Sequence, residues 1–161
     1  MPLGRVYQFK YLGHVVNDNA KDDLDVERER RALSIRGNML TRRFAKCIVE
    51  VKITLFKAYC QNFYTGSLWF CYTRGSYSAL RVLYNNIFRA LVGLPRYCSA
   101  SGMFADARVD DFFAIMRKKS LSCVRRVRGS TNSILKMIGA RLDTPLMARF
   151  TELHVLRHGA R

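Results

Sequence analysis

The chain has 161 residues, the length of a single domain, and 49% of them are hydrophobic, which is too many for an intrinsically disordered protein. Its formal charge of +16 is typical of proteins that contact a polyanion, either nucleic acid or an acidic membrane surface. Lys10 and His14 interrupt the only early apolar stretch, so no signal peptide is expected, and Glu50 and Lys52 argue against a membrane span in the apolar region 48–72. We therefore expect an intracellular protein, cytoplasmic or nuclear and not secreted.

Residues 8–16 read QFKYLGHVV and alternate apolar with polar side chains around Gly13. This pattern predicts a short β-hairpin within residues 1–17. Downstream of it the apolar residues recur with helical spacing. The sequence therefore predicts a mainly α-helical fold that is preceded by a short N-terminal β-hairpin.

A first helix is expected from about residue 22 to 47. Its acidic first turn suits the positive end of the helix dipole. The residues expected to face the core are Val26, Leu33, Leu40, Phe44 and Cys47. Basic residues fall on another face, namely Arg28, Arg31, Arg42, Arg43 and Lys46. Gly37 costs about 1 kcal/mol relative to alanine in mid-helix, which indicates that something approaches the backbone closely there.

Further helices are expected along the rest of the chain, with a break at TRGS (73–76) and another at GLPR (93–96). In the second helix, Leu55, Tyr59 and Phe63 are expected to face the core. SASGMF at 99–104 predicts a loop or a short helical turn. The expected helical ranges are 49–72, 77–92, 110–128 and, more weakly, 133–141 and 145–157.

Three patterns in the sequence have the spacing of catalytic or metal sites. KDDLD (21–25) and VDDFF (109–113) place carboxylates side by side, as two-metal enzymes do, but both open helices, where N-terminal capping explains them better. HVLRH (154–158) has two histidines at i, i+4, yet no third ligand is evident. The five cysteines form no C-x-x-C pair and are expected to be reduced thiols. We expect no catalytic residue, no metal site and no cofactor in this chain.

The positive charge is concentrated in the middle of the chain. Residues 30–128 hold 19 lysines and arginines against four acidic residues. This excess is larger than a small domain needs for solubility, so it favours binding to nucleic acid. An alternative is a basic helical scaffold that binds an acidic protein or a membrane surface.

Several blocks in order resemble the C-terminal part of the reverse transcriptases of LINE-type, non-LTR retrotransposons. The similarity covers about residues 7–135, and each block by itself is weak. The blocks are FKYLGHVV (9–16) followed by the acidic helix start, RGNML (36–40), LFKAYC (55–60), LYNNIFRALVGLPR (83–96) and SASGMF (99–104).

The resemblance implies three segments: residues 1–17 as the primer-grip hairpin, 18–105 as a helical thumb-like bundle, and 106–161 as the connecting region after the thumb. In that family the primer grip holds the primer 3′ end and the thumb cradles the template-primer duplex. The hairpin residues so implied are Lys10, Tyr11, Leu12 and Gly13. The helix residues expected to contact the duplex are Arg28, Arg31, Arg36, Gly37, Asn38, Arg42, Arg43 and Lys46.

The family's Tyr-x-Asp-Asp catalytic turn would precede residue 7, together with the fingers and palm. The resemblance therefore implies a fragment that is not an enzyme by itself. Mg²⁺ would be used by the full-length family on the palm, not by this segment. The expected partners are RNA–DNA or DNA duplex and the fingers and palm, and no membrane.

Overall fold

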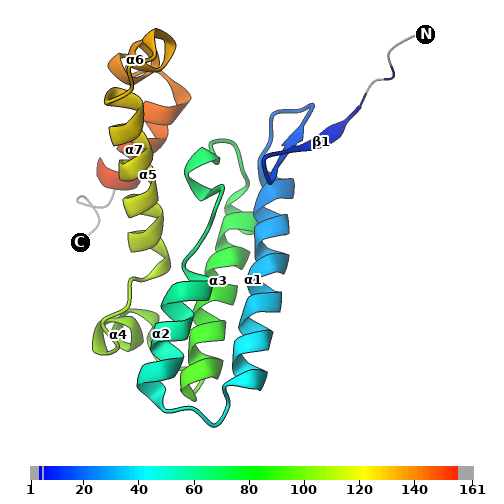
Figure 1. Cartoon of the computed structure of the whole chain (residues 1–161), viewed down its shortest axis with the longest axis vertical. Helices are drawn as coiled ribbons and strands as arrows, with labels where there is room; N and C mark the ends of the chain where they lie inside the picture. The colour runs from blue at the N-terminus through cyan, green and yellow to red at the C-terminus, as the bar shows by residue number, and fades with distance from the viewer. Residues whose placement is uncertain (1–3, 5, 156–161) are drawn as a thin grey trace.

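The computed structural model describes residues 4 and 6–155 of the chain (Figure 1). It confirms the predicted fold class, mainly helical with an N-terminal antiparallel hairpin. The elements are β1 (Gln8–Tyr11), β2 (His14–Asn17), α1 (Asp23–Arg43), α2 (Val49–Cys60), a 3₁₀ turn η1 (Gly66–Leu68), α3 (Arg74–Val92), α4 (Ala100–Asp106), α5 (Phe112–Arg128), α6 (Ser133–Ala140) and α7 (Pro145–Val155).

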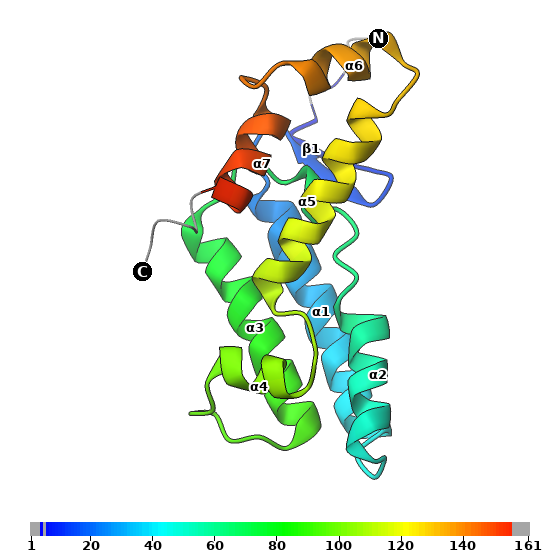
Figure 2. The same cartoon turned by 90° about the vertical axis from the view of Figure 1, so that its left-hand side faces the viewer.

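Helices α1, α2 and α3 form a bundle, and the hairpin extends from the N-terminal end of α1 (Figures 1 and 2). Val26, Leu33 and Leu40 are fully buried, as the helical spacing predicted. Phe44 lies just past the end of the helix and packs against the core, while Cys47 is half-buried. Helix α5 packs against η1 and α3, and α6 and α7 pack on α5 around a small second core.

An aromatic cluster joins four helices of the fold. The Tyr84 ring on α3 lies 5.0 Å from the Phe56 ring on α2 and 5.4 Å from the Phe104 ring on α4, measured between centroids. Its hydroxyl donates a hydrogen bond of 2.9 Å to the backbone carbonyl of Asp110, just before α5. Buried aromatic pairs of this kind contribute about 0.5–1.5 kcal/mol each beyond their buried area. The cluster therefore fixes α2, α4 and the start of α5 around α3.

The prediction of one helix over 49–72 was wrong, because α2 ends at Cys60. Residues 61–73 follow an irregular path whose backbone N–H groups at 70, 71 and 73 donate to carboxylates of α1 and its N-cap. The core-facing residues agree with the prediction only in part, since Phe63 is fully buried and Leu55 packs against the core. Phe56 and Cys60 are fully buried, whereas Tyr59 is 47% exposed. Helix α2 has only about three turns, and its packing against α1 and α3 buries Phe56 and Cys60, which lie beside the predicted stripe.

The prediction that TRGS breaks a helix was also wrong in its detail. Thr73 is the N-cap of α3, and its hydroxyl accepts a hydrogen bond of 3.2 Å from the backbone N–H of Ser76. Asp111 caps α5 as predicted, accepting from the N–H of Ala114 at 2.6 Å. The end of α3 agrees with the prediction, since Gly93 takes the left-handed conformation there, with φ of 83°.

The hairpin turn places Leu12 and Gly13 between the paired residues Tyr11 and His14. Both turn residues have positive φ, 46° for Leu12 and 86° for Gly13, as a two-residue turn of the primed type requires. Leucine is unfavourable there because its Cβ crowds the backbone in the left-handed region. The Leu12 side chain is also 74% exposed.

Replacing Leu12 with asparagine should therefore stabilise the isolated chain by about 1 kcal/mol, because asparagine tolerates the left-handed conformation. Urea denaturation measures the change, with Leu12→Ala as the control that removes the exposed leucine but keeps an unfavourable residue in the turn. A loss of stability in Leu12→Asn would mean that the leucine makes a contact the turn depends on.

Candidate nucleic-acid interface

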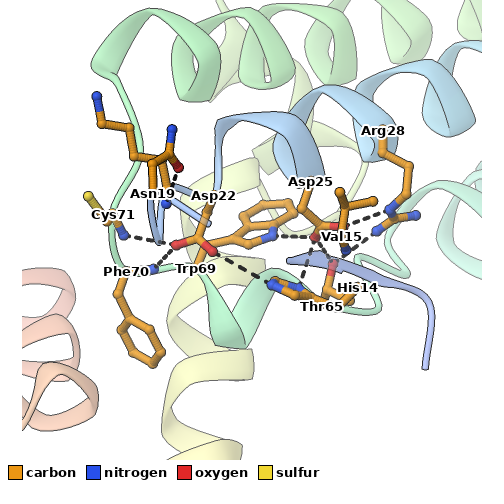
Figure 3. A network of polar contacts seen from close by, with 11 residues as sticks. His14, Val15, Asn19, Asp22, Asp25, Arg28, Thr65, Trp69, Phe70 and Cys71 are labelled. Atoms are coloured by element: carbon orange, nitrogen blue, oxygen red, sulfur yellow. Dashed lines mark hydrogen bonds and ion pairs between the residues drawn. The ribbon is translucent and has the colours of Figure 1, made fainter. Parts of the chain in front are cut away.

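One buried carboxylate holds the hairpin on α1 (Figure 3). Asp25 is fully buried, and its Oδ1 accepts hydrogen bonds from the backbone N–H of Val15 at 2.9 Å and from Arg28 Nε at 2.7 Å. Its Oδ2 accepts from Trp69 Nε1 at 2.7 Å and from Thr65 Oγ1 at 2.5 Å. Asp25 thus joins β2, α1 and the segment that follows α2.

The hydrogen bonds also keep Asp25 ionised. Burial alone would raise the pKa of this carboxyl group. Donation from Arg28, Thr65 and Trp69 outweighs that effect and lowers the pKa of Asp25 to about 2. The imidazole of His14 lies beside it, with Nδ1 3.2 Å from Asp25 Oδ2. The orientation of the hairpin therefore depends on a charged group.

The other acids of the KDDLD stretch also have structural partners. Asp22 accepts from the backbone N–H groups of residues 70–71 at 2.7 and 2.9 Å, and Asp23 accepts from the hydroxyls of Thr73 at 2.8 Å and Ser76 at 2.6 Å. The bond from Ser76 is the main reason that the pKa of Asp23 is lowered. The predicted capping role is corrected here: Asp22 occupies the N-cap position but its side chain makes no cap bond. These carboxylates hold residues 70–76 against the N-terminal end of α1.

A groove of about 680 Å³ lies between the hairpin and α1. Lys10 of β1 lines it on one side, and Arg28 and Arg31 of α1 line it on the other. The structure thus brings together three of the predicted site residues from two separate elements. Arg31 is 75% exposed and contacts Glu27 at 3.1 Å. Glu27 also lines the groove and is held mainly by its hydrogen bonds with Arg30, which lower its pKa to about 2.

A row of exposed residues continues from this groove along α1. Arg31, Ile35, Asn38 and Arg42 are all exposed and are spaced i, i+4, i+7 and i+11, so they share the face of the helix opposite its buried stripe. At about 1.5 Å per residue the row extends roughly 16 Å along the helix axis. Exposed Arg43 and Lys46 lie at the end of it. We call these six residues the α1 row.

Three residues of the predicted duplex-contacting set make contacts inside the protein. Gly37 is buried in the contact between α1 and α3, where an added Cβ would lie 2.6 Å from side-chain atoms of Ile87. The group that approaches the α1 backbone closely at Gly37 is therefore the Ile87 side chain of α3. Arg36 donates to the buried carboxylate of Glu29, and Arg28 is held by Asp25. Both arginines compensate internal charges and have little freedom to reach an external phosphate.

The predicted hairpin residues lie in the turn and in the part of β1 that precedes it. Lys10, Tyr11 and Leu12 are exposed, while Gly13 is half-buried, and a Cβ added to it would lie 3.6 Å from Cε1 of the Tyr64 ring. The sequence did not indicate the apolar part of the groove, to which Phe9 contributes, or the burial of Glu29. Only the position of Glu29 on the buried stripe of α1, four residues before Leu33, could have indicated its burial.

Comparisons with protein-family models, with curated proteins and with solved structures each found no match to this chain. In the part of the chain that the structure describes, no group of three or more histidine, cysteine, aspartate and glutamate residues could hold a metal ion. None of the described helices is both long and apolar enough to cross a membrane. The two histidines of the HVLRH pattern cannot be compared, because residue 158 lies outside the described residues.

Proposed function

We propose that the hairpin and the α1 row bind the backbone of a nucleic-acid duplex without reading its sequence, as the thumb of a LINE-type non-LTR reverse transcriptase holds template-primer duplex. The observation that supports this most is the groove in which Lys10 of β1 faces Arg31 of α1. It joins the hairpin and the first helix, two of the segments that carry the family resemblance.

The charges of this surface suit phosphate contacts. The salt bridges among the described residues leave Lys10, Arg42, Arg43 and Lys46 without a carboxylate partner, and these side chains are exposed. Lysine and arginine that are free of internal ion pairs can replace the counterions of a duplex, which is the main source of affinity in sequence-independent binding. Ile35, 70% exposed between Arg31 and Asn38, offers an apolar contact to the sugars.

Changing Arg42, Arg43 and Lys46 together to alanine should weaken duplex binding about equally for all sequences. Each lost phosphate contact should flatten the slope of log K against log salt concentration by roughly 0.9. Fluorescence anisotropy with an RNA–DNA and a DNA duplex over a series of salt concentrations measures both quantities. Alanine favours helix and these side chains are exposed, so thermal stability should change little.

The matched control changes Arg96, Arg125 and Arg126 to alanine, which removes the same charge from exposed positions away from the hairpin and α1. This control variant should keep most of the wild-type affinity for duplex and most of the slope of log K against log salt concentration. If the two triple variants lose equal duplex affinity, only the net charge of the chain matters. That result would contradict the proposed interface. Tight binding of the wild-type chain to acidic lipid vesicles without duplex binding would support the scaffold alternative.

A further inference from the structure

A second cavity, of about 330 Å³, lies between α3, α5 and α7, away from the hairpin. Four arginines and one acidic residue contribute to its lining. Its charged residues are Arg74 and Arg81 from α3, Arg117 from α5, and Arg149 and Glu152 from α7. Three aromatic side chains, Tyr72, Tyr77 and Phe113, form much of the remaining wall. A cavity of this size is within the range of small-molecule sites in proteins.

Arg149 is the most deeply buried of these cations, with only 8% of its side chain exposed. Its Nη1 is 3.0 Å from Glu152 Oε2, and its guanidinium carbon is 4.8 Å from the centroid of the Tyr72 ring. Its Nη2 is buried and has no hydrogen-bond partner among the described residues. A buried donor on a charged group that lacks a partner is unfavourable. An anion in the cavity would satisfy it.

The aromatic rings and guanidinium groups in the cavity wall also suit a planar ring of a ligand. Tyr72 and Tyr77 stack with centroids 4.9 Å apart at an interplanar angle of 17°. The guanidinium carbon of Arg81 lies 5.4 Å from the centroid of the Phe113 ring. Guanidinium groups and aromatic faces arranged in this way accept a stacked base. Burial is the main cause of the raised pKa of Tyr72, so its hydroxyl remains a neutral donor.

We propose that this cavity binds a nucleotide, with its phosphate on Arg149 and Arg117 and its base against the aromatic wall. The guanidinium fork matches phosphate oxygens in paired hydrogen bonds. One carboxylate, Glu152, balances only one of the four arginines, so the lining of the cavity is positively charged. The site is separate from the α1 row and does not depend on duplex binding.

The test measures binding of AMP, adenosine and inorganic phosphate to the full chain by titration calorimetry. AMP should bind more tightly than phosphate, and adenosine should bind weakest. Arg149→Gln and Arg117→Gln should each weaken AMP binding by about tenfold or more, the usual loss when a charged hydrogen bond is removed. The control is Arg125→Gln, an exposed position on α5 outside the cavity, which should bind AMP like the wild-type chain.

If Arg149→Gln fails to fold, Arg117→Gln decides the result, because its side chain is only half-buried. A 5′-phosphorylated trinucleotide distinguishes the source of the nucleotide: tighter binding than AMP indicates a strand end, and equal binding indicates a free nucleotide. The proposal is overturned if AMP does not bind at millimolar concentration. It is also overturned if Arg125→Gln loses as much affinity as Arg117→Gln, or if adenosine binds as tightly as AMP.

Discussion

Replacing Asp25 with alanine should lower the free energy of unfolding by about 3–5 kcal/mol, the range seen when one partner of a buried ion pair is removed. The variant leaves the buried Trp69 Nε1, the Thr65 hydroxyl and the Val15 N–H without their acceptor and Arg28 without its main counter-charge. Urea denaturation measures the loss. Asp106→Ala, at an exposed position on α4, is the control and should change stability little.

The same carboxylate should make the fold sensitive to acid. Its folded-state pKa of about 2 lies below the ordinary value of 3.8. The stability contributed by this difference, about 2 kcal/mol, is fully present above roughly pH 4 and is lost as the pH falls from 4 towards 2. In Asp25→Asn this part of the acid dependence should be absent. An unchanged slope of stability against pH in that variant would mean that Asp25 is not the titrating group.

Replacing Gly37 with alanine should destabilise the protein by about 1–3 kcal/mol, as overpacking of a core does, although alanine favours a helix by about 1 kcal/mol. The added Cβ would lie 2.6 Å from both Cγ1 and Cδ1 of Ile87 and 2.8 Å from Cγ2, so a simple rotation of the end of that side chain does not relieve the contact. Gly37→Leu should be worse still.

The double variant Gly37→Ala, Ile87→Ala tests the cause. Removing the isoleucine side chain makes room for the new methyl group, so the two changes together should cost less than the sum of the single changes. Thermal or urea denaturation of all four proteins gives the coupling. Additive costs would show that Gly37 is required for some reason other than its contact with α3.

The sequence predicted the fold well where a helix has a regular apolar stripe. Val26, Leu33 and Leu40 of α1 are buried as predicted, and the limits of α5 agree with the prediction within two residues. It failed for 61–73, because the partners that hold this segment in an irregular path are carboxylates about 50 residues earlier in the chain. The spacing of apolar residues cannot indicate such long-range hydrogen bonds. Because the helical spacing of apolar residues continues through 61–72, the sequence predicted a helix there.

The exposure of the candidate site residues could be predicted from the sequence, but their ion-pair partners could not. Helical spacing correctly grouped Arg31 and Arg42 on an exposed face, because exposure depends on the position around the helix axis. It could not reveal that Arg28 and Arg36 neutralise the buried acids Asp25 and Glu29. The charge of a side chain is visible in the sequence, but its ion-pair partner depends on the tertiary fold.

Photo-crosslinking from Ile35 tests the proposed interface most directly. Benzoylphenylalanine in place of this exposed residue sits in the middle of the α1 row, and the same group in place of Met137 on α6, 58% exposed, serves as the control. With a labelled template-primer duplex, we expect a crosslink to nucleic acid from position 35 and none from position 137, decreasing as salt is raised. A chain that binds duplex but crosslinks from position 137 and not from position 35 would contradict the proposal.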